Sequence, residues 1–311
     1  MLSNNFFKIF VTVAATENIS LAASLLHYTQ GAVSHSISRA EAELGFPLFQ
    51  RTQKGVVITE DGRSLLPYAK RIVDNLDQAD SAIAAIHGLN YGHIKVGTYA
   101  SISQHFLPEL IVDFSSDYPG ITIEIVESFY HNLIAMCMDR TIDIAFTTYM
   151  NNPDFDQLPL FEDPFVAIFK KGTPVKLDKN GLFHLSELSE LNFIMPMEGS
   201  KLDPDFRECF GKNLPQFNTH ISSLDYISIM CMVKAGLGCS MLPRLITPDY
   251  ENFLDIYPVY PHKSRVLCMA VRSLSTTSIS TLKFIEYTKK YVNERFLPDQ
   301  KKRGFTAFRT N

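Results

Sequence analysis

The sequence predicts a mainly helical N-terminal winged helix-turn-helix domain, a long linker helix and then an α/β domain of two lobes. Three observations lead to this fold class. Apolar residues recur at helical spacing in three short segments before residue 45. A longer apolar stripe continues from residue 59 to about residue 86. From residue 93 onward, short apolar strands alternate with amphipathic helices, which is typical of a parallel sheet covered on both faces.

The composition is that of a globular protein whose net charge is close to neutral. Of the 311 residues, 46% are hydrophobic and 20% are charged, and the net charge is −4. Any surface for nucleic acid must therefore be local. The chain lacks a run of about 18 apolar residues and a recognisable signal peptide, so we expect no membrane partner. Its five cysteines are dispersed without a CxxC pair, which favours reduced thiols and a cytoplasmic location.

Residues 1–58 predict the winged helix-turn-helix domain. Three hydroxyl residues are placed to cap its successive helices: Ser3, Ser20 and Thr29. In the second helix, Ala22 and Ala23 are small enough for close backbone approach, and Leu25 and Leu26 are expected to face the core. A short helix, a tight turn and a further helix form a helix-turn-helix arrangement.

The third helix has an apolar stripe and an unusual polar face. The stripe consists of Val33, Ile37, Ala40 and Leu44. Short hydrogen-bonding or basic groups occupy the polar side and the helix start: Thr29, Gln30, Ser34, His35, Ser38 and Arg39. Gln pairs with adenine through two hydrogen bonds, and Ser and His contact bases or phosphates. This pattern favours a DNA-reading face, and an ordinary solvated face is the alternative.

The stretch from Gln50 to Thr59 alternates around Gly55 as a small hairpin, which we interpret as the wing. Arg51 and Lys54 near its tip would reach phosphates or the minor groove. The alternative is a surface hairpin with incidental charge. Residues 1–58 contain four basic and three acidic side chains, so their net charge is only +1. One copy should therefore bind DNA weakly, and several copies must act together.

The run from Phe6 to Gly62 resembles the N-terminal domain of LysR-type transcriptional regulators. The matching residues are Ala22, Ala23, Gln30, Ala32, Val33, Ser34, Ile37, Glu41, Leu44, Gly45, Leu48, Phe49, Arg51, Thr59 and Gly62. The resemblance implies that five side chains face promoter DNA: those of Gln30, Ser34, His35, Ser38 and Arg51. Two positions depart from the family pattern. Ala40 stands where Leu is usual, and Gly31 where Ser or Pro is common.

Residues 59–88 predict one long linker helix, capped by Thr59 and ended at Gly88. Its apolar stripe comprises Leu65, Leu66, Ala69, Ile72, Val73, Leu76, Ala79, Ile83 and Ile86. A helix of roughly 40 Å cannot bury such a stripe alone. A second copy of the helix would cover it, and the resemblance implies a homodimer through this helix, with a tetramer expected. Packing on the chain's own second domain is the alternative.

Residues 91–299 predict an α/β domain in which two crossovers link two lobes, as in periplasmic binding proteins. We assign 91–162 and 269–299 to lobe I and 163–268 to lobe II. The resemblance implies the same effector-binding architecture, and the stretch from Lys234 to Pro243 matches a Gly-x-Gly…Leu-Pro pattern of the family.

Ligands of open α/β sheets bind beyond the carboxyl ends of the strands, near helix N-termini. Side chains at these junctions are mostly hydroxyls, with one cation: Thr98, Ser101, Ser103, Ser128, Tyr130, Thr147, Thr148, Ser200, Lys201 and Ser223. They predict a small polar or anionic effector. Helix capping is the alternative for each of them. The resemblance implies that Ser101 is an effector-contacting hydroxyl.

Other kinds of site are not indicated. The histidines and cysteines lack metal-ligand spacing, and no dinucleotide, phosphate-loop or nucleophile motif follows a strand, so we expect no metal, cofactor or catalytic residue. Cys209 lacks a second cysteine at the spacing of a thiol switch. The basic tail from Lys301 to Arg309 is expected to be a frayed, solvated terminus.

The favoured function is a ligand-responsive transcriptional regulator. Its expected partners are double-stranded promoter DNA, a small-molecule effector, further copies of the chain and RNA polymerase. The alternative is a solute-binding protein that uses the two-lobe domain without DNA. A third hypothesis is an enzyme, but the sequence lacks a group of residues that could act as acid, base or nucleophile.

Overall fold

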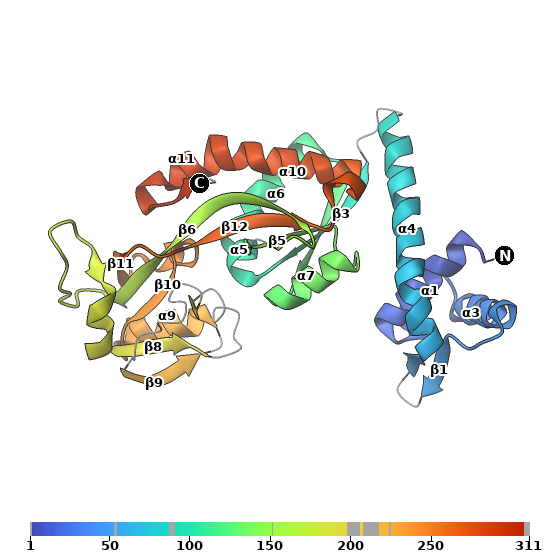
Figure 1. Ribbon diagram of the computed structural model, residues 1–311, viewed down its shortest axis with the longest axis horizontal. Helices are drawn as coiled ribbons and strands as arrows, with labels where there is room; N and C mark the ends of the chain where they lie inside the picture. The colour runs from blue at the N-terminus through green and yellow to red at the C-terminus, as the bar shows by residue number, and fades with distance from the viewer. Residues whose placement is uncertain are drawn as a thin grey trace. The chain divides into compact units, whose positions relative to one another are not determined.

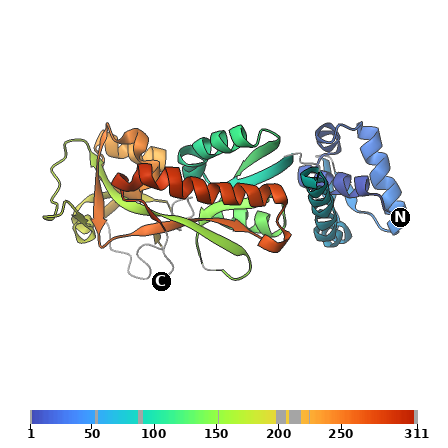
Figure 2. The same cartoon turned by 90° about the horizontal axis from the view of Figure 1, so that it is seen from above.

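The computed structural model describes residues 2–52, 55–86, 91–150, 152–197, 206–207, 218–223 and 225–307 (Figures 1 and 2). The chain divides into two compact units, Met1–Tyr91 and Gly92–Asn311. Among the described helices, none combines the length and the hydropathy that a bilayer span requires.

The first unit begins with three helices: α1 (Asn4–Thr16), α2 (Ile19–Leu25) and α3 (Gln30–Leu44). Two predicted caps are confirmed, because Ser3 accepts a hydrogen bond from the Phe6 N–H and Thr29 from the Ala32 N–H, each at 3.2 Å. The predicted cap at Ser20 is wrong. Asn18 caps α2 instead, and its Oδ1 accepts the N–H groups of Ser20 and Leu21 at 2.9 and 3.0 Å.

The core of this unit lies between α1, α2 and α3. Phe10, Val13 and Val33 are completely buried, and α2 contributes Ala22 and Ala23. The expectation that Leu25 faces this core is wrong, because its side chain is 59% exposed. Successive helical residues point about 100° apart, so the side of α2 that packs Ala22, Ala23 and the partly buried Leu26 against the core turns Leu25 toward solvent.

The wing consists of β1 (Phe49–Thr52) and β2 (Gly55–Ile58), which pair antiparallel. One carboxylate ties it to α3. Glu41 Oε1 accepts the backbone N–H groups of Leu48 and Phe49 at 2.7 and 3.1 Å. The start of the wing is thus fixed to the helix that carries the predicted DNA-reading face.

Helix α4 (Glu60–Ile86) begins at the predicted cap. Thr59 Oγ1 accepts the Gly62 N–H at 3.0 Å and donates to the Pro47 carbonyl at 2.7 Å. Gly62 is required by close packing, because a Cβ there would lie 2.4 Å from the Leu48 carbonyl oxygen. The first turns of the apolar stripe pack on α1 through buried Ala69, whereas Ile83 is 53% exposed. The predicted stop at Gly88 lies outside the described residues.

The second unit is built on a nine-stranded sheet whose main order is β4-β3-β5-β12-β6-β11-β7. The strands are β3 (Gly92–Thr98), β4 (Ile121–Glu127), β5 (Ile144–Thr148), β6 (Asp156–Lys170), β7 (Phe183–His184), β10 (Ser240–Pro243), β11 (Leu254–Tyr260), β12 (Ser264–Val271) and β13 (Thr306–Ala307). Strand β3 pairs parallel with β4 and β5, but β12, β10, β11 and β13 pair antiparallel with β6. The expected parallel sheet is therefore a mixed one, because the long β6 is antiparallel to all four strands that pair with it.

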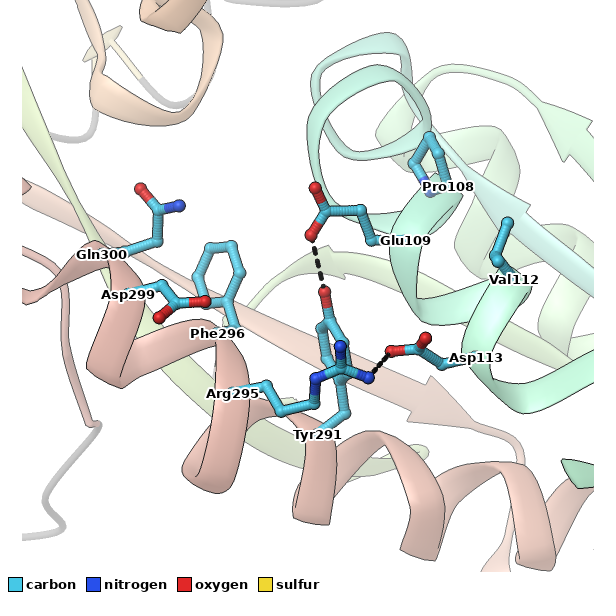
Figure 3. A pocket seen from close by; sticks show the side chains of 9 residues that line it. All are labelled: Pro108, Glu109, Val112, Asp113, Tyr291, Arg295, Phe296, Asp299 and Gln300. Carbon is cyan, nitrogen blue, oxygen red and sulfur yellow. Dashed lines mark hydrogen bonds and ion pairs between the residues drawn. The ribbon is translucent and has the colours of Figure 1, made fainter. Parts of the chain in front are cut away.

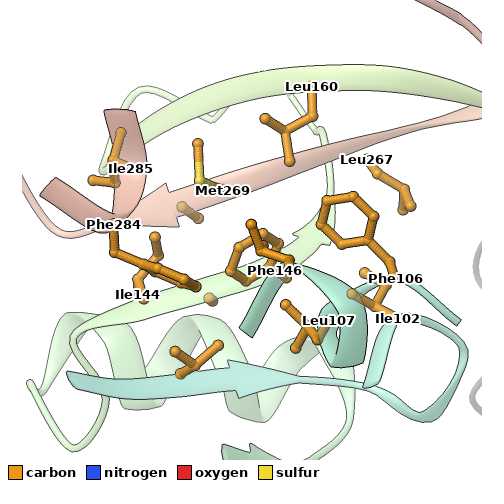
Figure 4. Packing of buried hydrophobic residues seen from close by; sticks show 14 of the residues in the cluster. Ile102, Phe106, Leu107, Ile144, Phe146, Leu160, Leu267, Met269, Phe284 and Ile285 are labelled. Carbon is orange, nitrogen blue, oxygen red and sulfur yellow. The ribbon is translucent and has the colours of Figure 1, made fainter. Parts of the chain in front are cut away.

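Helices cover both faces of the first part of this sheet (Figure 1). Helices α6 (Leu107–Asp117) and α10 (Ile279–Tyr291) pack together on one face, and α7 (Tyr130–Met138) lies on the other. The core between them is rich in phenylalanine, including Phe106, Phe146 and Phe284 (Figure 4). The short helix α5 (Ala100–His105) links β3 to α6.

A second group of elements, here called the second layer, packs around the C-terminal half of β6. It contains α9 (Tyr226–Ala235) and a small parallel sheet of β8 (Asn192–Pro196) and β9 (Asn218–Ser223). Strand β6 passes from one core to the others, because Phe161 belongs to the phenylalanine-rich core and Phe165 and Val166 to two further clusters. Asp163 lies at this crossing point, opposite Arg265 of β12.

Short helical turns complete the unit: η1 (Leu185–Glu190), η2 (Arg244–Ile246), η3 (Pro248–Tyr250), η4 (Leu274–Thr276), η5 (Val292–Phe296), α11 (Leu297–Gln300) and η6 (Lys301–Arg303). The expectation of a frayed tail is wrong as far as Ala307. Phe305 is 3% exposed and belongs to the phenylalanine-rich core, and β13 pairs with β6. The apolar side chain of Phe305 anchors this otherwise basic tail in the core.

The contact of Glu41 with the wing gives a stability prediction. We expect Glu41→Ala to lower the free energy of unfolding of the N-terminal unit by about 1–3 kcal/mol, because two half-buried N–H groups lose their acceptor. Hydrogen exchange at the wing amides would measure the loss. Glu41→Gln keeps a carbonyl acceptor and should recover most of it; equal losses in the two variants would contradict the assignment.

Candidate functional site

The predicted DNA-reading residues lie on the outer side of α3. Gln30, His35, Ser38 and Arg39 are exposed, whereas the apolar stripe on the other side is buried through Val33, Ile37 and Ala40. Thr29 is exposed too, but its hydroxyl already caps the helix. The face thus presents an amide, an imidazole, a hydroxyl and a guanidinium, which are donors and acceptors suited to base edges and phosphates.

The wing meets this face at one hydrogen bond. Arg51 on β1 donates from Nη2 to the hydroxyl of Ser34, at 3.2 Å. Arg51 and Ser34 are 17 positions apart in the sequence, and their contact places a wing cation beside the helix. Lys54, the other predicted wing residue, lies outside the described residues.

Several of the predicted effector-binding hydroxyls lie at or just after the carboxyl ends of the parallel strands β3 and β5. Four of them are buried: Thr98, Ser101, Thr147 and Thr148. Thr147 Oγ1 is buried without a hydrogen-bond partner among the described residues. Buried hydroxyls normally have a partner, so this end of β5 is an unusual place in the fold.

A buried ion pair stands next to these hydroxyls. Arg265 Nε and Nη2 lie 2.9 and 2.8 Å from Asp163 Oδ2, and both residues are at most 4% exposed. Asp163 Oδ1 also accepts the Leu245 N–H at 2.9 Å. The carboxylate therefore joins three elements, β6, β12 and η2. A buried charge is tolerated when it is paired and hydrogen-bonded in this way.

The same guanidinium reaches the predicted effector residues. Arg265 Nη2 donates to Ser101 Oγ at 3.2 Å, and Nη1 lies 3.5 Å from the Tyr99 hydroxyl. The Tyr99 hydroxyl is 3.0 Å from Thr148 Oγ1. Ser101 and Thr148, which the sequence predicts at separate strand ends, are thus connected through Tyr99 and Arg265.

The remaining predicted residues take other places. Ser103 donates to Glu127 and to the Ala100 carbonyl, and the Ser128 N–H donates to the Thr98 carbonyl at 3.0 Å. Ser223 lies at the end of β9, where its hydroxyl donates to the Asp225 carbonyl at 3.4 Å. Tyr130 is the first residue of α7. Ser200 and Lys201 lie outside the described residues.

Helix α5 also contacts the second layer directly. The Tyr226 hydroxyl at the start of α9 donates to Gln104, and His105 Nδ1 lies 4.0 Å from Asp249 Oδ2. Burial, followed by the charge of Glu127, raises the pKa of Tyr226 to about 12. Burial also lowers the pKa of His105, despite the nearby Asp249 carboxylate.

A cavity of about 410 Å³ lies away from these residues, between α6 on one side and the end of α10, η5 and α11 on the other (Figure 3). Its polar groups pair across it: Tyr291 donates to Glu109 Oε2 at 3.1 Å, and Arg295 forms an ion pair with Asp113. No predicted residue lines this cavity.

Two other kinds of chemistry, metal binding and reactive thiols, can be judged from the ligand groups and the buried cysteines of the described part of the chain. It contains no group of three or more His, Cys, Asp or Glu side chains that could hold a metal ion. Burial raises the pKa of the Cys137 and Cys239 thiols to about 12, which disfavours the reactive thiolate. Cys209 lies outside the described residues.

The sequence patterns do not single out Tyr99, Asp163 or Arg265 as site residues. One feature of the sequence could have identified the two charged residues, because Asp163 and Arg265 each interrupt or adjoin an otherwise apolar strand. Charged residues are rarely fully buried unless they are paired. Choosing the partner required the antiparallel register of β6 and β12, which the sequence does not reveal.

Comparison with known proteins places both units of the chain in one family. Residues 5–63 match the model of the bacterial regulatory helix-turn-helix protein, lysR family, and residues 87–293 match the model of the LysR substrate binding domain. The transcriptional regulator CfxR of Cupriavidus necator is 31% identical over 239 residues, which are 76% of this chain and 74% of that protein.

Two solved structures share the fold along most of the chain. A full-length variant of OxyR from Pseudomonas aeruginosa has a TM-score of 0.74 at 22% identity, covering 94% of this chain and 95% of that one. Full-length CbnR in complex with its target DNA has a TM-score of 0.56 at 18% identity, covering 93% and 99%. The chain therefore belongs to the LysR family, whose members are DNA-binding transcriptional regulators with an effector-binding domain and not enzymes.

Proposed function

We propose that this regulator responds to a small polar or anionic effector, which binds between the two lobes of the second unit and changes how the DNA-binding domains meet a promoter. One observation carries the proposal: Ser101, Tyr99 and Thr148 are connected to Arg265, which stands on a strand that runs between the lobes. A ligand that bonds to Ser101 would alter the hydrogen bonds of a guanidinium at the crossing of β6 and β12.

The response to such a ligand is a shift between two arrangements of the lobes. An effector changes this equilibrium only by the difference of its affinities for the two arrangements. Ser101 accepts a hydrogen bond from Arg265, so its own hydroxyl proton is directed elsewhere and suits an acceptor on a ligand. The unpartnered hydroxyl of Thr147 at the end of β5 is a second candidate contact.

On the DNA side, we propose that two copies bind an inverted repeat through the outer faces of α3, with Arg51 at the flanking phosphates. The distal part of α4, where Ile83 is exposed, would pair with the same part of α4 in the second copy. A tetramer would bring further DNA-binding domains to one promoter. RNA polymerase is the further partner that regulation of transcription requires. Since promoter DNA is the target, the protein would act in the cytoplasm.

Binding to the DNA upstream of the protein's own gene tests the proposal. We expect a gel shift at low salt that weakens steeply as salt rises, because phosphate contacts release counterions. A folded, oligomeric sample that shifts no fragment at low salt would contradict regulation and favour a solute-binding protein.

Two substitutions should separate base reading from phosphate binding. Gln30→Ala should relax base choice at one position, at a cost of about 1–3 kcal/mol for the preferred site, because Gln can bond bidentately to adenine. Arg51→Ala should weaken all sequences about equally and reduce the salt slope by about one. Competition with randomised DNA sites would measure the base preference and the affinity of both variants. An unchanged base preference in Gln30→Ala would show that the DNA-reading face has been assigned to the wrong side of α3.

The effector site can be tested on the full chain by thermal shift against small organic acids, amino acids and sugars. A ligand at about 100 times its Kd should stabilise the protein by about 2.7 kcal/mol, which is a shift of a few degrees. Ser101→Ala should abolish the shift for that ligand. Ser186→Ala, at an exposed serine of η1, is the matched control and should keep it. A ligand whose shift survives Ser101→Ala would bind elsewhere.

A further inference from the structure

The last described segment of the chain, residues 297–307, connects parts of both lobes. We propose that this segment, here called the C-terminal strap, holds the two lobes at their crossing through a permanent anchor and a releasable ion pair. It would thereby set how freely the lobes move. The proposal rests on the proposed function only in one respect, namely that lobe movement is what the effector controls.

The anchor of the strap is Phe305. Its ring centroid lies 5.9 Å from that of Phe161 on β6 and 5.6 Å from that of Phe296, and its side chain is 3% exposed. The next two residues form β13, in which Thr306 pairs with Glu162 and Ala307 with Phe161. The strap therefore adds a strand to β6 immediately before Asp163, the residue that holds Arg265.

The releasable contact is made by Arg303. Its Nε lies 3.3 Å from Glu251 Oε1, and the same oxygen accepts from Arg244 Nη2 at 2.7 Å. Glu251 follows η3, whose Tyr250 packs against the cluster that contains Val166 and Ile168. Anchor and ion pair thus contact different cores, and the strap bridges the crossing between them.

A reversal of the backbone separates the two contacts. Gly304 has a φ of +89°, a left-handed conformation that glycine adopts without strain, and it lies beside Pro164. This turn allows Arg303 to point toward Glu251 while Phe305 enters the core. Pro164 follows Asp163 in β6, so the turn also lies at the crossing.

The part of the strap before these contacts borders open space. Asp299 and Gln300 of α11 line one side of the 410 Å³ cavity, and Pro108 and Glu109 of α6 line the other (Figure 3). Helix α11 is therefore not packed against α6 along its whole length. Space on this side would allow the strap to shift while Phe305 stays in place.

The two contacts differ in strength for a physical reason. The Arg303 and Glu251 side chains are 33% and 37% exposed, so water and salt screen their attraction. Phe305, by contrast, is buried among aromatic rings. The ion pair is thus weak enough to open during a conformational change, and the anchor is not.

Hydrogen exchange of the full chain, read at the amides of residues 161–163, 165 and 265–267, tests the strap. We expect Arg303→Gln to speed exchange there about threefold at low salt, the scale of one exposed ion pair, and Arg303→Lys to recover most of the protection. High salt should speed exchange in the wild type and leave Arg303→Gln unchanged. Lys301→Gln, which removes an exposed cation from the same strap, is the matched control and should have no effect.

A chain that ends at Gly304 removes the anchor and β13. We expect it to exchange at the same amides more than about tenfold faster than the wild type, while the wing amides of the first unit are unchanged. Circular dichroism would establish that it is folded. Wild-type exchange at the crossing in both this chain and Arg303→Gln would overturn the proposal.

The same samples separate this proposal from the proposed function. Arg51→Ala should weaken DNA binding and keep wild-type exchange at the crossing. If the wild type binds no DNA, the proposed function fails, and the exchange rates still decide whether the strap holds the lobes.

Discussion

The ion pair between Arg265 and Asp163 is the constraint around which the second unit is arranged. A buried carboxylate and a buried guanidinium are costly unless every donor and acceptor has a partner, and here the partners come from β6, β12, η2 and α5. Because these elements belong to different cores, the requirement to pair the charges fixes the crossing of the lobes. The strand ends that carry Ser101 and Thr148 are held to the same point through Tyr99.

The N-terminal unit uses polar contacts for a similar purpose on a smaller scale. Glu41 holds the beginning of the wing, Thr59 joins the end of the wing to α4, and Arg51 contacts Ser34 across the gap between wing and helix. The contacts of Glu41 and Thr59 satisfy backbone groups at helix and strand ends that would otherwise lack partners. The result is a rigid relation between α3 and the wing, which a protein that reads one DNA site requires.

Local features could be predicted from the sequence, and features that depend on distant contacts could not. Helical spacing was sufficient for the buried side of α3, and the caps at Ser3 and Thr29 follow from residue type. At the start of α2, two capping residues competed, and Asn18 rather than Ser20 has the extended backbone of a cap. The burial of Phe305 and the pairing of Asp163 with Arg265 depend on contacts across more than about 100 positions, which local patterns do not encode.

A double-mutant cycle on Asp163 and Arg265, read as exchange free energies of the β6 and β12 amides, is the most direct measurement of the central claim. Asp163→Leu and Arg265→Met should each cost about 3–5 kcal/mol, because each leaves one charge buried and unpaired. The double variant should cost much less than the two together, since no charge remains in the interior. Losses that simply add to within about 0.5 kcal/mol would contradict the claim that this pair holds the crossing.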